Sequence, residues 1–371
     1  MLIIGEQGIL VQRVNRNITA ILFGCTLLLP ACKQNYRLGP AAAAPTISVQ
    51  VTTLAGSGSA GSANGTGIMA SFNYPTGVAV DTSGNVYIAD YGNILIRKIT
   101  SGGMVTTFAG SGSAGSANGT GTTASFNYPI GVAVDNTGNI YVADVYNNLI
   151  RKITSGGVVT TLAGSGVFGS ANGTGTAASF NGSAGVAVDN SGNIYVADVY
   201  NNLIRKITSG GVVTTLAGSG SSGSTNGTGT TASFNQPSGV AVDTSGNVYV
   251  ADTTNNLIRK ITSGGVVTTL AGSGFSGSTN GTGTSASFQE PDGVSVDVSG
   301  NVYVADTSNN LIRKITSGGV VTTLAGSGSG GSSNGTGTSA SFNLPNGIAV
   351  DASGNIYVAD PGNNLIRKIY Q

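Results

Sequence analysis

Aspartate is the residue type in this sequence that could most readily do chemistry, and it recurs in a fixed pattern. The stretch GVAVDTSGNVYIAD, from Gly77 to Asp90, carries Asp81 and Asp90 with a glycine and an asparagine between them. Paired carboxylates can serve in acid–base catalysis or bind a divalent cation. The chain contains no histidine, which removes the commonest general base and metal ligand and every Ser-His-Asp or Cys-His arrangement.

The aspartate pattern returns six times at steps of 54 residues. The first aspartate of each copy stands at Asp81, Asp135, Asp189, Asp243, Asp297 and Asp351. A catalytic centre needs a few unlike groups that converge, so twelve equivalent aspartates are better explained as structural. We expect the Asp81 carboxylate to bond backbone amides of the turn Thr82–Gly84, and Asp90 to do the same at the next corner or to pair with Arg97. Calcium bound by D-x-S-G-N is the alternative, although the EF-hand spacing with its closing glutamate is absent.

Four strands are predicted in each copy to position these residues. They are Gly77–Asp81, Asn85–Asp90, Asn93–Ile99 and Met104–Gly110 in the first copy, rich in Val, Ile, Tyr and Thr. Gly, Ser, Asn and Asp fill the gaps between them, and the spacing suits tight hairpins. A four-stranded antiparallel sheet that repeats about every 50 residues is the signature of a β-propeller.

The ends of the repeat region predict that the ring closes. The segment 51–56 is a strand with no hairpin partner in the first copy, and the last copy stops at LIRKIYQ without its fourth strand. Strand 51–56 can therefore join the last blade and leave no long free edge. The predicted fold is an all-β, six-bladed propeller of four-stranded antiparallel blades over residues 48–371, with a monomer expected.

The repeated phrase P-x-G-V-A-V-D-x-S-G-N-V-Y-V-A-D-x-x-N-N-L-I-R-K-I resembles the NHL repeat. The connector LAGSG…NGTG…ASFN is similar to that of many bacterial NHL proteins, with Asn64-Gly65 where those often have Asp-Gly. The resemblance implies a six-bladed propeller used mostly to bind proteins, RNA or other ligands. Some NHL-related propellers are lyases or lactonases, which gather a metal or a His/acid cluster at the channel mouth.

Composition narrows the function classes. Charged residues make up 8% of the chain and the net charge is +1, so no basic stripe is present to bind a nucleic-acid backbone. Both cysteines, Cys25 and Cys32, lie near the N-terminus, so residues 33–371 can form neither disulfides nor thiolate zinc sites. We expect no cofactor and no metal.

The N-terminus is predicted to carry an export signal. Arg13 and Arg16 precede the short apolar run Ile18–Cys32, which predicts a signal peptide over residues 1–32. Its end resembles a bacterial lipoprotein signal with lipidation at Cys32, although Pro30 departs from that pattern; Cys25 is a second candidate. An ordinary cleaved signal and an uncleaved anchor are alternatives. Residues 33–47 are predicted to be a flexible tether. The chain is expected at the bacterial outer membrane or cell surface, or else in the periplasm.

Differences between the copies gather in three segments: the residues after GSG, those before the first strand, and the loop between the second and third strands. In an up-and-down blade these segments share one face. One sector of that face is aromatic and another is acidic, and exposed aromatic residues commonly anchor binding surfaces. The predicted ligand contacts are Tyr74, Tyr91, Tyr128, Tyr146, Tyr200, Glu290 and Asp292. Drift in tolerant loops is the other explanation.

These observations predict a non-catalytic binding platform at the cell envelope, attached by an N-terminal lipid, whose partner is a protein or a glycan. The alternative is an enzyme of the lactonase or lyase kind that uses a metal near Glu290 and Asp292. The missing histidine counts against it. A third interpretation is a structural spacer with no ligand.

Overall fold

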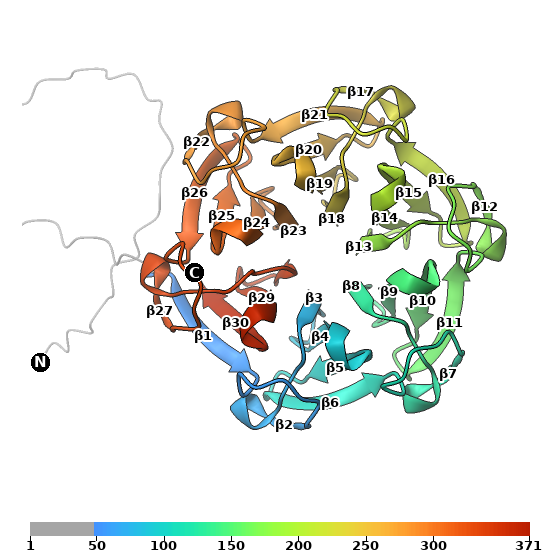
Figure 1. Cartoon of the computed structure of the whole chain (residues 1–371), viewed down its shortest axis with the longest axis vertical. Coiled ribbons are helices and arrows are strands. Elements are labelled where there is room, and N and C mark those ends of the chain that lie inside the picture. Colours follow the sequence, from blue (N-terminus) through green and yellow to red (C-terminus); the bar gives the residue numbers. More distant parts are fainter. Residues whose placement is uncertain (1–47) are drawn as a thin grey trace, which may run out of the picture. The chain divides into compact units, whose positions relative to one another are not determined.

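Residues 48–371, which are the part of the chain that this computed structural model describes, form a ring of six blades around a central channel (Figure 1). The first blade runs outward from the channel through β3 (Pro75–Val80), β4 (Val86–Asp90), β5 (Leu95–Ile99) and β6 (Met104–Ala109). All neighbouring strands are antiparallel. The predicted all-β six-bladed propeller is confirmed.

The other blades repeat this order. From the channel outward, the second blade contains β8 (Pro129–Val134), β9 (Ile140–Asp144), β10 (Leu149–Ile153), β11 (Val158–Ala163) and β7 (Gly119–Thr120), and the third contains β13 (Ser183–Val188), β14 (Ile194–Asp198), β15 (Leu203–Ile207), β16 (Val212–Ala217) and β12 (Gly173–Thr174). The fourth blade contains β18 (Pro237–Val242), β19 (Val248–Asp252), β20 (Leu257–Ile261), β21 (Val266–Ala271) and β17 (Gly227–Thr228), and the fifth contains β23 (Pro291–Val296), β24 (Val302–Asp306), β25 (Leu311–Ile315), β26 (Val320–Ala325) and β22 (Gly281–Thr282). The sixth blade contains β28 (Ile348–Val350), β29 (Ile356–Asp360), β30 (Leu365–Tyr370), β1 (Gln50–Ala55) and β27 (Gly335–Thr336).

The helices of the described residues are single 3₁₀ turns of two kinds. One kind lies in the connector between blades: η1 (Gly67–Met69), η3 (Gly121–Thr123), η5 (Gly175–Ala177), η7 (Gly229–Thr231), η9 (Gly283–Ser285) and η11 (Gly337–Ser339). The other kind joins the second and third strands of a blade: η2 (Tyr91–Asn93), η4 (Val145–Asn147), η6 (Val199–Asn201), η8 (Thr253–Asn255), η10 (Thr307–Asn309) and η12 (Pro361–Asn363). No helix in residues 48–371 is both long and apolar enough to cross a membrane.

Strand β1 closes the ring, as the sequence predicts. It lies antiparallel to β30, with Gln50 opposite Tyr370 and Thr53 opposite Arg367. The first strand of the propeller thus completes the last blade, and Figure 1 shows the blue β1 beside the red β30. Because the closing strand comes from the far end of the chain, the ring has no long exposed sheet edge.

Each blade has a fifth strand that the sequence analysis missed. In the first blade it is β2 (Gly65–Thr66), which pairs through Gly65 with Val105 and through Thr66 with Met104 at the outer edge of β6. A two-residue pairing leaves no strand-like pattern in the sequence, and it forms because the connector crosses the outer edge and covers its backbone groups.

The core lies between the blades. Alternate residues of β4 point to opposite neighbours: Val86 and Ile88 pack against the sixth blade, whereas Tyr87 and Ala89 pack against Phe126 and other residues of the second. Six such clusters surround the ring. A single blade would expose both faces to water, so the packing of neighbours stabilises the fold.

The predicted signal peptide (1–32), the lipidation candidates Cys32 and Cys25, and the tether (33–47) all lie outside the described residues.

Candidate binding face and channel mouth

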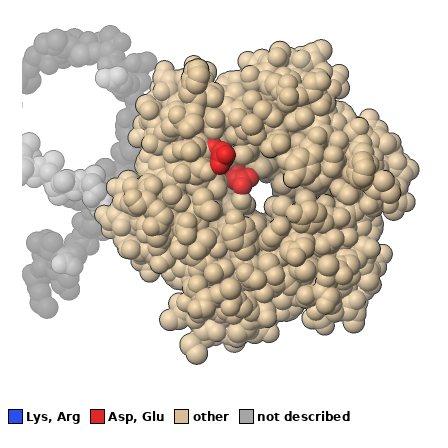
Figure 2. Space-filling view, in the orientation of Figure 1, with Lys and Arg blue, Asp and Glu red and all other residues tan. Residues whose placement is uncertain are grey.

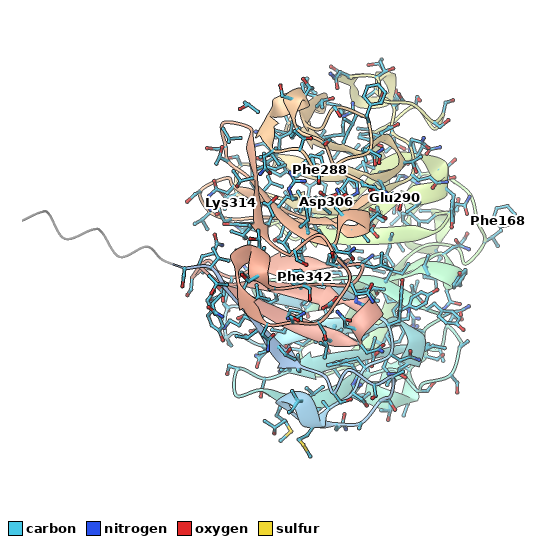
Figure 3. The ribbon with its side chains drawn as sticks, turned by 60° about the vertical axis from the view of Figure 1, so that its left-hand side comes forward. Phe168, Phe288, Glu290, Asp306, Lys314 and Phe342 are labelled. Atoms are coloured by element: carbon cyan, nitrogen blue, oxygen red, sulfur yellow. The ribbon has the colours of Figure 1, made fainter. Side chains whose placement is uncertain are left out.

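The three variable segments meet at one face of the ring, which we call the variable face. In the first blade the Gly92 N–H of η2 donates to the Asn73 carbonyl at 2.8 Å, and Asn93 Nδ2 donates to the Gly61 carbonyl at 2.7 Å. The near-constant turns, such as Asp81–Gly84 and Thr100–Gly103, lie at the other face, the constant face. Figure 3 shows Glu290 and Phe168 toward one side of the ring and Lys314 toward the other.

The first aspartate of each repeat is a turn fixture, as predicted. Asp81 Oδ1 accepts hydrogen bonds from the Ser83 and Asn85 amides at 2.9 and 2.8 Å, and Asp81 Oδ2 accepts from Asn85 Nδ2 at 2.8 Å. The Tyr87 hydroxyl adds a fourth donor at 3.3 Å. Both carboxylate oxygens of Asp81 accept hydrogen bonds from nearby donors, so they are already engaged and this arrangement does not favour calcium binding.

These contacts predict a loss of stability in alkali. Burial, then the charge and hydrogen bond of the turn aspartate, raises the pKa of Tyr87 to about 12, and the same holds for Tyr141, Tyr195 and Tyr249. The folded state therefore keeps protons that the unfolded chain releases from pH 10 upward, so the stabilisation present below pH 10 is lost as the pH rises toward 12. We expect the urea midpoint to fall across this window while absorbance at 295 nm shows late tyrosine ionisation. A Tyr141→Phe variant with an unchanged pH dependence and an unchanged titration would contradict this assignment.

The second aspartate of each repeat forms a buried ion pair with the arginine of its own blade. Asp90 Oδ2 lies 2.8 Å from Arg97 Nη1, and both side chains are fully buried. Asp90 Oδ1 accepts the Asn73 N–H at 2.8 Å. Arg97 Nη2 donates to the Ala63 carbonyl at 3.1 Å and to Asn64 Oδ1 at 3.0 Å. The ion pair thus ties the long connector to the blade and positions the variable face.

The burial of this ion pair changes the pKa of its aspartate. Burial raises the pKa of Asp90, while the N–H donors of Asn93 and Asn73 and the guanidinium of Arg97 lower it. The guanidinium also lies 5.4 Å from the centre of the Phe72 ring. The same ion pair recurs in all six blades, so the six second aspartates hold the fold, as the six turn aspartates do.

The residue before each inner strand adopts a left-handed backbone conformation. Tyr74 has φ = 52° and Glu290 has φ = 48°, and the equivalent residues of the other blades share this conformation. In five blades an asparagine of the preceding blade holds it: Asn364 Oδ1 accepts the Tyr74 N–H and Asn256 Oδ1 accepts the Glu290 N–H, both at 2.9 Å. Ile94 replaces this asparagine before Tyr128. Sequence reasoning missed this clamp, although the repeated Asn-Asn pair before the third strand signals it, because asparagine tolerates the left-handed region.

Five of the predicted contact residues gather into one aromatic row. The ring centres of Tyr74 and Tyr91 lie 6.0 Å apart, those of Tyr91 and Tyr128 lie 5.0 Å apart, and those of Tyr128 and Tyr146 lie 5.3 Å apart. Tyr200 follows in the third blade. Burial raises the pKa of Tyr91 to about 12, with a further contribution from its hydrogen bond to Tyr146. The side chains of Tyr146 and Tyr200 are 62% and 63% exposed, so the row is open to a ligand.

A pocket of about 220 Å³ opens at the third-blade end of this row. Its lining includes Tyr91, Tyr146, Tyr200 and Phe168, together with Gly182. Sequence reasoning selected the tyrosines but missed Gly182 as a site residue. The signal was present, because the third copy reads FNGSAG where the first reads FNYPTG.

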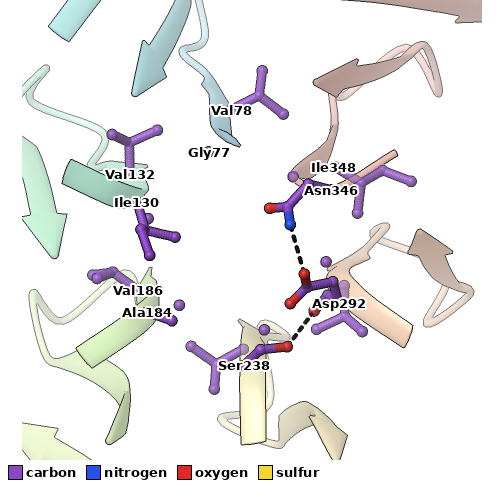
Figure 4. A pocket seen from close by; sticks show the side chains of 17 residues that line it. Gly77, Val78, Ile130, Val132, Ala184, Val186, Ser238, Asp292, Asn346 and Ile348 are labelled. Carbon is purple, nitrogen blue, oxygen red and sulfur yellow. Dashed lines mark hydrogen bonds between the residues drawn. The ribbon is translucent and has the colours of Figure 1, made fainter. Parts of the chain in front are cut away.

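The predicted acidic residues lie apart from the tyrosines, in the fifth blade. Asp292 lines the channel mouth, where its Oδ2 accepts a hydrogen bond from Asn346 Nδ2 and its carbonyl accepts one from Ser238 Oγ at 3.1 Å (Figure 4). Ile130 and Ala184 face them across the channel in the same view. The mouth is therefore polar on one side and apolar on the other.

Burial raises the pKa of Asp292; hydrogen bonds from Ser238 and Asn346 lower it, and the charge of Glu290 raises it again. Glu290 itself is exposed and accepts a hydrogen bond from Ser308 Oγ at 2.5 Å. Figure 2 shows acidic atoms beside the channel, and no lysine or arginine on the face that it draws. The variable face is therefore close to uncharged away from the fifth blade.

Comparison with known proteins identifies the repeat. The family model of the NHL repeat matches residues 72–99, 126–153, 180–207, 234–261, 288–315 and 342–369, one match in each blade. The chain is an NHL-repeat β-propeller protein. Each match ends in the strand that carries the buried arginine, so the ion pair with the second aspartate lies inside the family pattern.

Three relatives place this NHL propeller among known proteins. NHL repeat-containing protein 2 of Gallus gallus is 42% identical over 93 residues, which are 24% of this chain and 13% of that protein. An auxiliary nutrient binding protein of Bacteroides thetaiotaomicron is similar in structure, with a TM-score of 0.66, 17% identity, and coverage of 87% of this chain and 76% of that one. A gluconolactonase of Xanthomonas campestris has a TM-score of 0.58 and 13% identity, covering 86% and 89%. At these identities the structural likeness shows the fold alone.

The donor set at the channel mouth of the NHL propeller bears on the enzymatic alternative. Glu290 and Asp292 are the two carboxylates near it that stand outside the repeated pattern. Within residues 48–371, no group of three or more His, Cys, Asp or Glu side chains converges in a way that could hold a metal ion. Asparagine and serine, rather than further carboxylates or imidazoles, surround Asp292.

Proposed function

We propose that this NHL propeller is an exported, non-catalytic binding platform whose variable face holds a protein or a glycan. The observation that carries the proposal is the contiguous row of tyrosines from Tyr74 to Tyr146, continued by Tyr200. Tyrosine offers a large apolar ring and a polar hydroxyl at low cost in conformational entropy, and both kinds of partner use it.

The direction of β1 bears on which face an attachment at the N-terminus would leave free. Gln50 lies opposite Tyr370, next to Gln371, whose Nε2 donates to the carbonyl of Gly354 in a turn of the constant face. The strand ends near η12 at the variable face. A lipid on Cys32 and a tether over residues 33–47 would join the propeller at its constant face. The variable face would then be free for a partner, and the propeller would act as a monomer.

The first test is ligand capture by the chain and by a quadruple variant in which Tyr74, Tyr128, Tyr146 and Tyr200 are changed to alanine. Solubilised envelope proteins and a glycan array supply the candidate ligands. We expect a partner retained by the parent chain to bind the variant at least about tenfold more weakly, as expected when aromatic anchors are removed. Phe275→Ala, which truncates an 80% exposed aromatic residue in the connector before the fifth blade, is the control and is expected to bind normally.

Equal capture by the parent and the folded quadruple variant would refute the aromatic row as the site. The enzymatic alternative is a lactonase-like or lyase-like propeller with a metal near Glu290 and Asp292. The observation that favours it is the position of Asp292, a carboxylate outside the repeated pattern, at the channel mouth. This alternative predicts lactone hydrolysis that depends on a divalent metal and is abolished in Asp292→Asn. Turnover that survives this substitution would exclude the carboxyl from catalysis.

A further inference from the structure

We propose that the pocket over Gly182 is a subsite for one uncharged sugar ring of a glycan, and that the tyrosine row extends from it. This inference rests on the proposed binding function and names the ligand class and the site. The pocket is a feature of the third blade, because the equivalent position holds Tyr74, Tyr128, Gln236, Glu290 and Leu344 in the other blades.

Because Gly182 has no side chain, the Tyr200 ring can lie close to its backbone and form one wall of the pocket. A Cβ atom at Gly182 would lie 2.4 Å from Cδ2 of Tyr200, so any other residue at this position would displace the Tyr200 ring. The backbone of the loop nevertheless keeps the conformation of the other blades: Gly182 has φ = 68°, and its N–H donates to Asn148 Oδ1 at 3.2 Å. Glycine therefore removes a side chain without changing the loop, and Tyr200 turns into the vacated space.

The Tyr200 loop is also held at its base. The Tyr200 N–H donates to the Asn181 carbonyl at 3.1 Å, and the Asn181 N–H donates to the buried Asp198 Oδ1 at 2.8 Å. Asp198 forms the buried ion pair with Arg205. The pocket wall is thus fixed to the rigid part of the blade, which favours a preformed site.

The chemistry of the walls fits a neutral sugar ring. Tyr91, Tyr146, Tyr200 and Phe168 supply aromatic faces on which the C–H face of a pyranose can stack. The amides of Asn148 and Asn181 and the tyrosine hydroxyls supply donors and acceptors for its hydroxyl groups. No lysine, arginine, aspartate or glutamate lines the pocket, so neither an anionic nor a cationic ligand finds an opposite charge. The cavity volume of about 220 Å³ is below the range of drug-sized sites, so the pocket suits a single small ring rather than a larger molecule.

An open site continues from this pocket along the tyrosine row. Phe168 is 73% exposed and projects from the ring (Figure 3), and the row leads from Tyr146 toward Tyr74 with ring centres 5–6 Å apart. A chain of several sugar units could therefore occupy the pocket with one ring and lie over the row with the next.

The test is a titration of the full chain with maltotriose, cellotriose and chitotriose, in which binding is measured by calorimetry and by tyrosine fluorescence. Glucuronate and choline are the anionic and cationic probes. We expect at least one neutral trisaccharide to bind saturably and neither charged probe to compete with it. Gly182→Gln, which installs the residue of the fourth blade, is expected to weaken that binding by about tenfold or more. Gln236→Ala, at the equivalent position of the fourth blade, is expected to leave it unchanged.

Tyr200→Ala and Phe168→Ser change exposed side chains and keep the test decisive if Gly182→Gln does not fold; each is expected to weaken trisaccharide binding. Binding of none of the three trisaccharides, binding that Gly182→Gln and Tyr200→Ala leave intact, or displacement by choline would overturn the inference. If no sugar binds while the quadruple tyrosine variant still loses an envelope protein partner, the sugar subsite is wrong and the proposed binding platform stands.

Discussion

Gly131→Ala is expected to destabilise the propeller by about 3 kcal/mol or more, at the upper end of overpacking effects. Gly131 lies in the inner strand β8 at the channel, where a Cβ atom would lie 2.1 Å from the carbonyl oxygen of Ala184 in the third blade. The next nearest atom is the Val186 amide nitrogen at 3.1 Å. Both are backbone atoms, so no side chain can rotate away and the inner strands would have to separate. The change would weaken the packing between the second and third blades.

Chemical denaturation followed by far-UV circular dichroism measures this effect. Gly156→Ala is the matched control, because Gly156 is an exposed turn residue whose nearest neighbour to a new Cβ is Thr154 Oγ1 at 3.8 Å. We expect the control to shift the midpoint little and Gly131→Ala to shift it strongly or to prevent soluble expression. Equal midpoints for the two variants would show that the inner strands are more loosely packed than the structure indicates.

Asp198→Ala is expected to cost about 3–5 kcal/mol, because it leaves the buried Arg205 guanidinium without its counter-charge. Asp198 Oδ2 lies 2.7 Å from Arg205 Nη1, and both side chains are fully inaccessible to solvent. The same carboxylate accepts the Asn181 N–H, so the substitution also loosens the base of the pocket over Gly182. Loss of stability and loss of ligand binding are therefore expected together.

A second substitution separates the charge from the packing. In the double variant Asp198→Ala/Arg205→Met the unpaired charge is gone, and replacement of a buried ion pair by apolar groups is often close to neutral. We expect the double variant to recover a large part of the stability that Asp198→Ala loses, as measured by the denaturation midpoint. Asp189→Ala, at a half-buried turn residue of the same blade, is the control with a smaller expected loss. If Asp198→Ala unfolds no more easily than Asp189→Ala, the ion pair does not hold the blade.

Much of this protein follows from its sequence because the repeat is written six times. The 54-residue step between aspartates such as Asp81 and Asp135 predicts the number of blades, and the β-branched runs predict the four main strands. The unpaired strand at 51–56 predicts how the ring closes, because a strand without a hairpin partner must pair elsewhere. The turn role of Asp81 is also local, since its donors lie within six residues of it.

Only the tertiary structure decided the contacts between segments that are distant in the sequence. The sequence left open whether Asp90 caps a corner or pairs with Arg97 of its own or a neighbouring blade, and folding places that arginine at 2.8 Å within the same blade. Folding also brings the tyrosines of successive blades into one row and leaves Glu290 and Asp292 apart from them. The short strand β2 and the left-handed residues before the inner strands depend on backbone pairing and on an asparagine of the previous blade. The pocket over Gly182 has the Tyr200 ring as a wall because this ring lies where a side chain at position 182 would be. The sequence shows that Gly182 lacks a side chain, but it does not show which neighbouring residue takes that place.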